Sequence, residues 1–347
     1  MATSLGHYGV SLGAGQLAQA VTSADVVLVD DVLAGQLPET ASTVIAVKGA
    51  EDTKTLAGCE RVILALRAAG VRRGDHLLAI GGGAVQDVAT FVADIYMRGI
   101  AWSYAPSTLM AMVDSCIGGK SSINVGEVKN LVGGIYPPRH VYVDPMLLDS
   151  LSPAALGSGF AEAAKIAFCR SADAFTGYLE RYAAFADDPT ELIHHVLLAK
   201  KWFIEIDEHD RAERRLLNFG HTFGHALEAA TDHSLPHGLA VAVGVLCATA
   251  HPLAARNEAT IALGRHCTEL IGLAGGLVPA AVAGYDHGVF ERAFRSDKKH
   301  SLGWFHLILP AEAGGVTEVR LRSDDAGWAS VAEATRRSID TLRSELP

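Results

Sequence analysis

Three histidines and one glutamate carry the clearest chemical signal in this sequence. His221 and His225 lie four residues apart in GHTFGHALE, and His237 follows in LPHGL at the start of another helical pattern. Residues four apart on a helix project from one face, so the first two imidazoles point the same way. Upstream, Glu162 and Lys165 share a helical face in GFAEAAK. Because Zn²⁺ binds imidazole nitrogen and carboxylate oxygen, one glutamate and two of these histidines would make a metal site with room for water or substrate.

The spacing leaves open which two histidines would bind the metal. His221 and His225 could both be ligands, as in the HExxH helix of zinc proteases, but no glutamate stands beside His221 to act as the base. A histidine pair on one helix can also be purely structural.

Basic and amide side chains in the same half of the chain suit an anionic substrate. They are Lys200, Arg214 and Asn218, and the run DKK adds Lys298 and Lys299. Arginine presents a fork of donors that matches a carboxylate or a phosphate. We therefore expect an anion-binding pocket, although a solvated surface run would explain the lysine pair equally well.

A glycine-rich segment in the first half carries a second polar group. It reads DSCIGGKSSIN and then KN, and its polar residues are Asp114, Lys120, Asn124, Lys129 and Asn130. Lysine supplies a point charge with three donors, and asparagine both donates and accepts, which suits a phosphate and sugar hydroxyls. We expect this loop to bind a phosphate or a polyol, with a solvated charged loop as the alternative.

Three consecutive glycines at residues 81–83 close a predicted strand and precede a helix expected to start near Val85. Glycine lets the backbone approach a diphosphate, and a helix N-terminus favours negative charge, although a tight turn would use the same residues. Asp87 could bind a cofactor hydroxyl, but capping of the helix is the simpler interpretation. Ser107 and Thr108 add hydroxyls that could reach a nicotinamide or a ribose.

The composition is that of an ordinary globular protein. The 347 residues are 49% hydrophobic and 20% charged, with a formal net charge of −10, which argues against general binding to nucleic acid or anionic membranes. The five cysteines are scattered without a CxxC pair, as expected for reduced thiols. The N-terminus does not resemble a signal peptide, and the apolar stretch at 239–250 is too short to span a bilayer, so we expect a cytoplasmic protein.

Hydrophobic periodicity predicts two domains. Segments 24–31, 42–49 and 75–83 are typical of buried strands, with a helix at 52–69 between the last two, and 101–106 and 140–145 indicate two further strands. From about 151 the patterns are helical, except for a possible short strand or hairpin at 304–315. We predict an α/β Rossmann-like domain at residues 1–150 and an all-α domain at residues 151–347, with the boundary near 147–152.

Taken together, these motifs resemble 3-dehydroquinate synthase and the wider sugar phosphate cyclase family. The likeness runs from about residue 50 to about residue 315 and includes GGGAVQDVATF, the loop from MRG to KNLVG, SGFAEAAK, RRLLNFGHTFGHALE, HGLAVAVG and DKK. These pieces follow in the family's order with nearly its spacing, and that combination is far more specific than any one of them. The resemblance implies the dehydroquinate synthase-like fold.

The resemblance also implies roles for individual residues. The metal ligands would be Glu162, His221 and His237. The catalytic group would be Lys165, His225, Asp114, Lys120 and Asn130. The residues binding substrate would be Arg98, Asn124, Lys129, Lys200, Arg214, Asn218 and Lys298, with Lys299 as the neighbouring alternative to Lys298. The residues binding the cofactor would be Glu51, Lys54, Gly82, Gly83, Asp87, Ser107 and Thr108.

The chemistry that the resemblance implies uses NAD and Zn²⁺ or Co²⁺ on a phosphorylated seven-carbon sugar. A ring hydroxyl is oxidised transiently, phosphate leaves by β-elimination, the hydride returns, and an intramolecular aldol step closes a six-membered carbocycle. There is no net redox change, because NAD is restored in each turnover. A homodimer, with no nucleic-acid or membrane partner, is expected.

Several positions depart from the family pattern. Leu239 follows His237-Gly238 where the synthase typically has glutamate, residues 84–86 (AVQ) replace a VIGD-like run, and Thr90 stands where glycine is common. Arg214, Asn218 and the GGK loop favour a substrate with a carboxylate, such as 3-deoxy-arabino-heptulosonate 7-phosphate or its amino analogue.

Other functions remain alternatives. Synthases of 2-deoxy-scyllo-inosose share most of these motifs, as do epi-valiolone synthases, which act on sedoheptulose 7-phosphate. An NAD-dependent polyol or alcohol dehydrogenase shares the overall fold, and an inactive binding protein could retain it.

Overall fold

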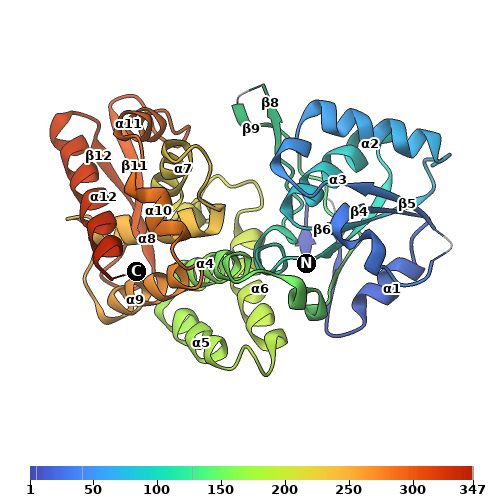
Figure 1. The fold of residues 1–347 in the computed structure, drawn as a ribbon, viewed down its shortest axis with the longest axis horizontal. Coiled ribbons are helices and arrows are strands. Elements are labelled where there is room, and N and C mark those ends of the chain that lie inside the picture. Colours follow the sequence, from blue (N-terminus) through green and yellow to red (C-terminus); the bar gives the residue numbers. More distant parts are fainter. Residues whose placement is uncertain (5, 41, 127, 346–347) are drawn as a thin grey trace. The chain divides into compact units, whose positions relative to one another are not determined.

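The computed structural model describes residues 1–4, 6–40, 42–126 and 128–345. The chain divides into two compact units, Met1–Leu151 with Pro189–Leu197, and Ser152–Asp188 with Leu198–Pro347 (Figure 1). No feature of the sequence indicates that residues 189–197 group with the first unit.

The first unit is built on a six-stranded parallel sheet with the strand order β3-β10-β7-β6-β4-β5. Its strands are β3 (Gly9–Leu12), β4 (Val26–Asp30), β5 (Thr43–Val47), β6 (His76–Gly81), β7 (Ala101–Pro106) and β10 (His140–Val143). The five strands predicted from the sequence all form. The sixth strand, β3, was not predicted, because its short sequence GVSL is only half-buried at the edge of the sheet.

Burial along the strands corrects one expectation. Strands β4 and β6 lie inside the sheet, and Val26 to Val29 and Leu77 to Ile80 are at most 1% exposed. Strand β5 lies at the opposite edge from β3, and Val44 is 41% exposed. The prediction of a buried strand at 42–49 was therefore wrong, because a continuous run of apolar residues marks a strand but not its place in a parallel sheet.

Helices and two hairpins complete the first unit. The α-helices are α1 (Gln16–Thr22), α2 (Leu56–Ala68) and α3 (Gly83–Ile95), and the hairpins are β1 (Ala2–Thr3) with β2 (Gly6–His7) and β8 (Ile123–Val125) with β9 (Val128–Val132). Helix α3 packs on β6 and β7, and α2 packs on α3. Short helical turns are η1 (Asp31–Gln36), η2 (Glu51–Thr53), η3 (Tyr96–Arg98), the π-helical turn η4 (Ala111–Ser115) and η5 (Pro145–Ser150).

The second unit is helical apart from one hairpin, β11 (Trp304–Pro310) with β12 (Val316–Arg322), which fits the expected strand or hairpin at 304–315. Its helices are α4 (Pro153–Arg170), α5 (Ala172–Ala183), α6 (Pro189–Ile206, whose first half groups with the first unit), η6 (Glu213–Asn218), α7 (His221–Ala230), α8 (His237–Ala250), α9 (Glu258–Gly272), α10 (Leu277–Ala283), α11 (His287–Arg295) and α12 (Asp325–Glu345). Helix α8 is apolar on all sides and packs on α4, α7, α9 and α12, as expected for a core helix.

Two glycines allow α8 to approach the helices that carry the candidate metal ligands. A Cβ on Gly238 would lie 2.2 Å from the carbonyl oxygen of Ser158 on α4, and a Cβ on Gly244 would lie 2.0 Å from the carbonyl oxygen of Gly220 just before α7. Only glycine fits at either position, so α8 packs closely on α4 near its own start and, near its middle, on the residue that precedes α7.

Among the described residues, no single helix is both long and apolar enough to cross a membrane. One sharply bent pair, Glu258–Gly272 with Leu277–Ala283, meets the length and composition requirement only when its helices are taken together.

Candidate active site

A buried carboxylate lies at the centre of the second unit's polar cluster. Glu162 on α4 is 1% exposed, and its Oε2 lies 2.6 Å from Nζ of Lys165. Lys165 also donates to the carbonyl oxygen of Leu217, 3.0 Å away. Glu162 Oε1 has no hydrogen-bond partner among the described residues. Because an ionised oxygen without a partner is costly to bury, this atom is suited to a cation.

Two imidazoles face that oxygen. Nε2 of His221 lies 3.4 Å from Glu162 Oε1, and Nε2 of His237 lies 3.7 Å from it. Zinc bonds of 2.0–2.1 Å in tetrahedral geometry put neighbouring ligand atoms about 3.4 Å apart. The two distances from Glu162 Oε1 therefore match those between ligand atoms that share one ion.

Contacts on the far side of each ring leave both Nε2 atoms free to bind a metal. Nδ1 of His221 lies 3.2 Å from the carbonyl oxygen of Phe219, and Nδ1 of His237 lies 3.2 Å from Oε1 of Glu228. Protons on the two Nδ1 atoms satisfy both contacts and put the lone pairs on Nε2. The sequence analysis missed Glu228, although it stands seven residues after His221 on the same helix.

Charge and burial shift the pKa values of the two imidazoles in opposite directions. Burial, and then the positive charge of Lys165, hold the pKa of His221 well below its ordinary value, so this ring is neutral. Burial would also lower the pKa of His237, but the hydrogen bond and charge of Glu228, with the charge of Glu162, raise it above its ordinary value.

His225 brings a third imidazole to the cluster. The nearest ligand atoms of His221, His225 and His237 all lie within 4.8 Å of one another. The ring of His225 stacks on that of His237, with centroids 5.6 Å apart and an interplanar angle of 25°. The helical spacing thus places His225 beside the metal site, where it can bind substrate or move a proton.

Of the two lysines in the DKK run, Lys299 is held by an ion pair and the predicted Lys298 is exposed. Asp297 holds Lys299 through Nζ at 2.6 Å and through the backbone N–H at 3.0 Å, whereas Lys298 is exposed. The pKa of His221 is lowered mainly by burial, then by the charges of Lys165 and His237, and then by the charge of Lys299. The charge of Lys299 thus acts on the histidines.

A shaped loop holds the predicted anion-binding arginine. Arg214 is 5% exposed, and its Nη1 donates to the carbonyl oxygen of Glu208 at 2.7 Å. Asp207, at the end of α6, accepts backbone N–H groups from Arg211, Ala212 and Arg214. Burial would raise the pKa of Asp207, but these three hydrogen bonds together lower it. The sequence carries no signal for this role of Asp207.

The other two predicted anion-binding residues lie on neighbouring elements. Lys200 is 4% exposed on α6, and Asn218 Nδ2 donates to the carbonyl oxygen of Arg215 at 2.9 Å. Asn218 ends η6, only three residues before His221, so this turn leads directly into the metal cluster.

In the first unit, the glycine run opens α3 at the carboxyl ends of β6 and β7. Gly82 is the N-cap of α3, and a Cβ there would lie 3.2 Å from the methyl group of Thr108. Ser107 donates its backbone N–H to Gly81 at 2.9 Å, and Thr108 Oγ1 accepts from Ala111. A Cβ on Gly83 would meet only Ser115 Oγ, at 3.9 Å, so the first turn of α3 is open to a diphosphate.

Asp87 does not cap α3, so the simpler sequence interpretation was wrong. Asp87 Oδ2 lies 2.7 Å from Lys54 Nζ, and its Oδ1 accepts the backbone N–H of Ser122 at 2.9 Å. Burial raises the pKa of Asp87 to about 6, although Lys54 opposes this shift. Glu51 likewise accepts from Asn124 Nδ2 at 2.8 Å. The residues predicted to hold a cofactor therefore also hold the glycine-rich substrate loop.

The remaining predicted residues are half-buried or exposed. Asp114 lies half-buried on η4, and Lys120 is half-buried with its carbonyl oxygen accepting from Gln86. Lys129 is exposed on β9. Arg98 is exposed in the left-handed region with φ 65°, and among the described residues it makes no hydrogen bond or ion pair.

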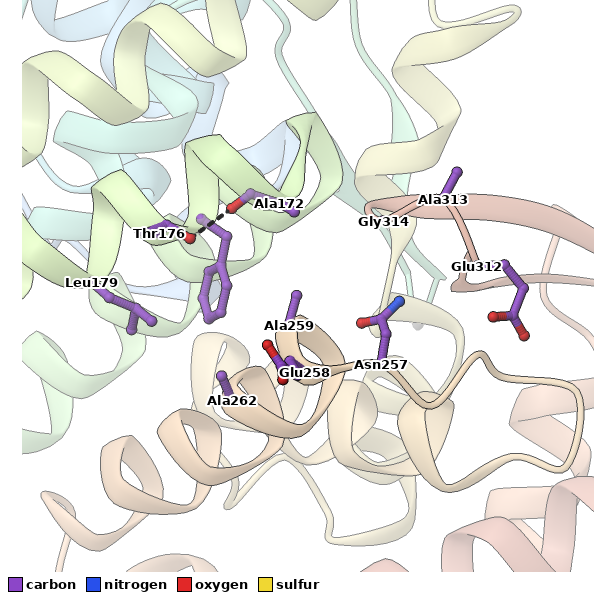
Figure 2. A pocket seen from close by; sticks show the side chains of 11 residues that line it. Ala172, Thr176, Leu179, Asn257, Glu258, Ala259, Ala262, Glu312, Ala313 and Gly314 are labelled. Carbon is purple, nitrogen blue, oxygen red and sulfur yellow. Dashed lines mark hydrogen bonds between the residues drawn. The ribbon is translucent and has the colours of Figure 1, made fainter.

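A separate groove of 520 Å³ lies between α5, the first turn of α9 and the turn that joins β11 to β12 (Figure 2). Its charged lining residues are Glu258 and Glu312, and it has no lysine or arginine. Because it offers no cation to an anionic substrate, the groove is not part of the candidate active site.

The first unit is an open parallel sheet with a glycine-rich start to one helix, and the second is a helical unit with a buried carboxylate beside imidazoles. Together these features define the dehydroquinate synthase-like fold class. Residues 44–158 match the family described as "3-dehydroquinate synthase N-terminal", and residues 159–300 match "3-dehydroquinate synthase C-terminal". A 3-dehydroquinate synthase from Methylacidiphilum infernorum is 34% identical over 315 residues, which cover 89% of this chain and 85% of that enzyme. The chain therefore belongs to the 3-dehydroquinate synthase family of sugar phosphate cyclases.

Other relatives match over shorter stretches. The 3-dehydroquinate synthase of Latilactobacillus sakei is 40% identical over 206 residues, which cover 59% of this chain but only 58% of that enzyme.

Solved structures of related enzymes share the fold. ValA, a 2-epi-5-epi-valiolone synthase from Streptomyces hygroscopicus solved with NAD⁺ and Zn²⁺, superposes with a TM-score of 0.80 at 24% identity and covers 97% of this chain and 99% of its own. A 2-deoxy-scyllo-inosose synthase in complex with carbaglucose-6-phosphate, NAD⁺ and Co²⁺ has a TM-score of 0.73 at 22% identity, covering 95% of this chain and 96% of its own.

Proposed function

We propose that this protein is a metal- and NAD-dependent cyclase that converts 3-deoxy-arabino-heptulosonate 7-phosphate, or its amino analogue, to a six-membered carbocycle with release of phosphate. The overall change is the loss of phosphate and the closure of one carbon–carbon bond, with no net oxidation. Membership of the 3-dehydroquinate synthase family supports this assignment.

The single observation that carries the proposal is the Glu162 carboxylate. Its buried Oε1 has no hydrogen-bond partner among the described residues, and it faces two imidazole Nε2 atoms at 3.4 and 3.7 Å. A divalent cation that joins the three atoms would satisfy this buried oxygen. The donor set of one oxygen and two nitrogens suits Zn²⁺ or Co²⁺ and leaves a position for substrate.

The chain's own residues prepare the metal site. Lys165 holds the Glu162 carboxylate through an ion pair of 2.6 Å with Oε2. Phe219 and Glu228 accept from the two Nδ1 atoms and so hold the rings with Nε2 toward Glu162. When bound, the divalent ion would polarise neighbouring substrate oxygens, and NAD⁺ would accept a hydride from a ring hydroxyl carbon and later return it.

Positive side chains would hold the two anionic ends of the substrate. Buried Arg214 and Lys200 suit the carboxylate, because a buried guanidinium and ammonium bind a carboxylate with little competition from water. Lys299 beside His225 suits the phosphate in the second unit, and Lys120, Lys129 and Asn130 supply further donors from the glycine-rich loop.

The proposal is tested by incubating the purified protein with 3-deoxy-arabino-heptulosonate 7-phosphate, NAD⁺ and Zn²⁺ or Co²⁺. Phosphate release is followed with time, and the product is identified by mass. We expect one phosphate per carbocycle formed and no accumulation of NADH. Sedoheptulose 7-phosphate serves as the matched substrate without a carboxylate.

Each outcome assigns a different function. Turnover of sedoheptulose 7-phosphate alone would place the protein among the epi-valiolone synthases. Net formation of NADH from a simple alcohol would make it a dehydrogenase. The absence of turnover with every substrate in the metal- and NAD-loaded protein would contradict the proposal.

A further inference from the structure

Asn130 stands in an unusual backbone conformation on an exposed hairpin. Its φ is 54°, in the left-handed region, and residues Val128 to Leu131 of β9 are all exposed. A two-stranded hairpin has little stability of its own, and asparagine tolerates the left-handed region without requiring it. The hydrogen bonds around Asn130, which the proposed function places at the substrate, therefore decide how firmly this conformation is held.

The side chain of Asn124 supplies that constraint. Its Oδ1 accepts the backbone N–H of Asn130 at 2.8 Å, and its Nδ2 donates to Glu51 Oε1 at 2.8 Å. The ionised carboxylate of Glu51 can only accept, so it forces Nδ2 toward itself and Oδ1 toward Asn130. Asn124 itself is 7% exposed, whereas its partners Glu51 and Asn130 are exposed.

The backbone of Asn124 is anchored independently of its side chain. Its N–H donates to the carbonyl oxygen of Lys54 at 2.9 Å, and Lys54 Nζ pairs with Asp87 at 2.7 Å. Asp87 in turn accepts the backbone N–H of Ser122 at 2.9 Å. The carboxamide of Asn124 is thus a rigid link between Glu51 and the hairpin.

We infer that Asn124 is a positioning residue that passes the orientation of Glu51 to the backbone of Asn130. The inference rests on the proposed function, which places Asn130 at the substrate, and on the family resemblance, which gives Glu51 to the cofactor. Only Oε1 of Glu51 makes the bond to Asn124, so Oε2 can bind a ribose hydroxyl at the same time. Bound cofactor would immobilise Glu51, strengthen the link and hold Asn130 in its left-handed conformation. Cofactor binding and order of the substrate hairpin are therefore coupled with positive sign.

Hydrogen exchange at the amide of Asn130 tests the inference in the full-length protein without any turnover. Asn124→Asp keeps the size and the Oδ1 acceptor but replaces the Nδ2 donor with a charge that repels Glu51. We expect exchange at Asn130 to accelerate on the order of tenfold, because repulsion by Glu51 turns the new carboxylate away and the hydrogen bonds to Glu51 and Asn130 are both lost. Asn257→Asp is the matched control, because it also replaces an Nδ2 donor, here to the carbonyl oxygen of Ala311, with a charge, while Oδ1 still caps α9.

Two variants of Glu51 test the other end of the link, again by hydrogen exchange at the amide of Asn130. Glu51→Gln retains an oxygen that can accept from Asn124, so exchange should stay within about twofold of wild type, whereas Glu51→Ala should match Asn124→Asp. Saturating NAD⁺ should slow exchange at Asn130 in wild type and leave Asn124→Asp unchanged. Thermal unfolding of each variant verifies that the fold persists.

Three results would overturn the inference or part of it. Equal exchange at Asn130 in wild type and in folded Asn124→Asp would show that the bond from Asn124 to Glu51 is not needed to hold the hairpin. Equal acceleration in Glu51→Gln and Glu51→Ala would show that no acceptor at Glu51 is needed. Bound NAD⁺ that leaves wild-type exchange unaltered would remove the coupling. A protein that binds no NAD⁺ contradicts the proposed function instead, while the comparison without cofactor still tests Asn124.

Discussion

Replacing Glu228 by glutamine should weaken metal binding without disturbing the three ligands. Oε1 of Glu228 lies 3.2 Å from Nδ1 of His237, and the proposed metal site uses the opposite nitrogen of this ring. The carboxylate fixes the proton on Nδ1 and makes Nε2 more basic, whereas a glutamine oxygen keeps the contact but loses the charge. Loss of such an outer partner typically costs 10- to 100-fold in metal affinity, or about 1.4 to 2.7 kcal/mol.

The affinity is measured by competition for Zn²⁺ with a chromophoric chelator at fixed pH. Glu269→Gln is the matched control, because Glu269 Oε2 lies 3.5 Å from Nδ1 of His266 in a carboxylate–imidazole pair outside the cluster. We expect Glu228→Gln to lose at least tenfold and Glu269→Gln to lose less than twofold. Wild-type affinity in folded Glu228→Gln would refute the claim that this carboxylate tunes His237.

Four further changes give separate readouts. Lys299→Met should raise KM for the phosphorylated substrate at least about tenfold, whereas Lys298→Met should change it less than twofold; equal effects would mean that the wrong lysine was placed beside the histidines. Arg214→Ala should weaken an acidic heptulose phosphate more than sedoheptulose 7-phosphate, and equal losses in kcat/KM would undercut the carboxylate assignment. Gly238→Ala should lower the free energy of unfolding by roughly 1 to 3 kcal/mol in denaturant titration, because the added Cβ would clash with α4. Burial lowers the pKa of His251 from 6.5 to about 4, so unfolding takes up a proton between these values. The free energy of unfolding should therefore fall by roughly 2 to 3 kcal/mol more in wild type than in His251→Asn as the pH drops from 6.5 to 4, and parallel pH profiles would contradict this.

The predictable part of the fold follows from strong periodic signals. Strands β4 and β6 are continuous apolar runs, and their burial on both sides explains why the sequence marks them clearly. Strand β5 has the same composition but lies at an edge, and position in a sheet is set by topology rather than by local sequence. Strand β3 has almost no apolar pattern, because as an edge strand it pairs with only one neighbouring strand, β10.

The candidate site divides in the same way. Helical spacing predicts that His221 and His225 share a face, but only the packing of α4, α7 and α8 brings Glu162 and His237 to them. Family resemblance supplied those ligands because its motifs encode that packing indirectly.

Contacts made by loops and turns could not be predicted from the sequence. Lys298 and Lys299 are adjacent, so the backbone of one turn decides which of them faces the cluster. The bond from Asn124 to Asn130 depends on a left-handed residue that no sequence pattern specifies. Leu239, which departs from the family pattern, is fully buried beside α4, and Glu228 on α7 supplies the carboxylate next to His237.

The most direct test of the account is an anomalous diffraction map recorded at the zinc edge from crystals of the protein loaded with Zn²⁺. The account predicts one strong peak about 2.0 to 2.2 Å from Glu162 Oε1, His221 Nε2 and His237 Nε2, and no such peak in Glu162→Gln treated in parallel. A peak elsewhere, or no bound zinc in the folded wild-type protein, would contradict the metal centre and with it the proposed cyclase function.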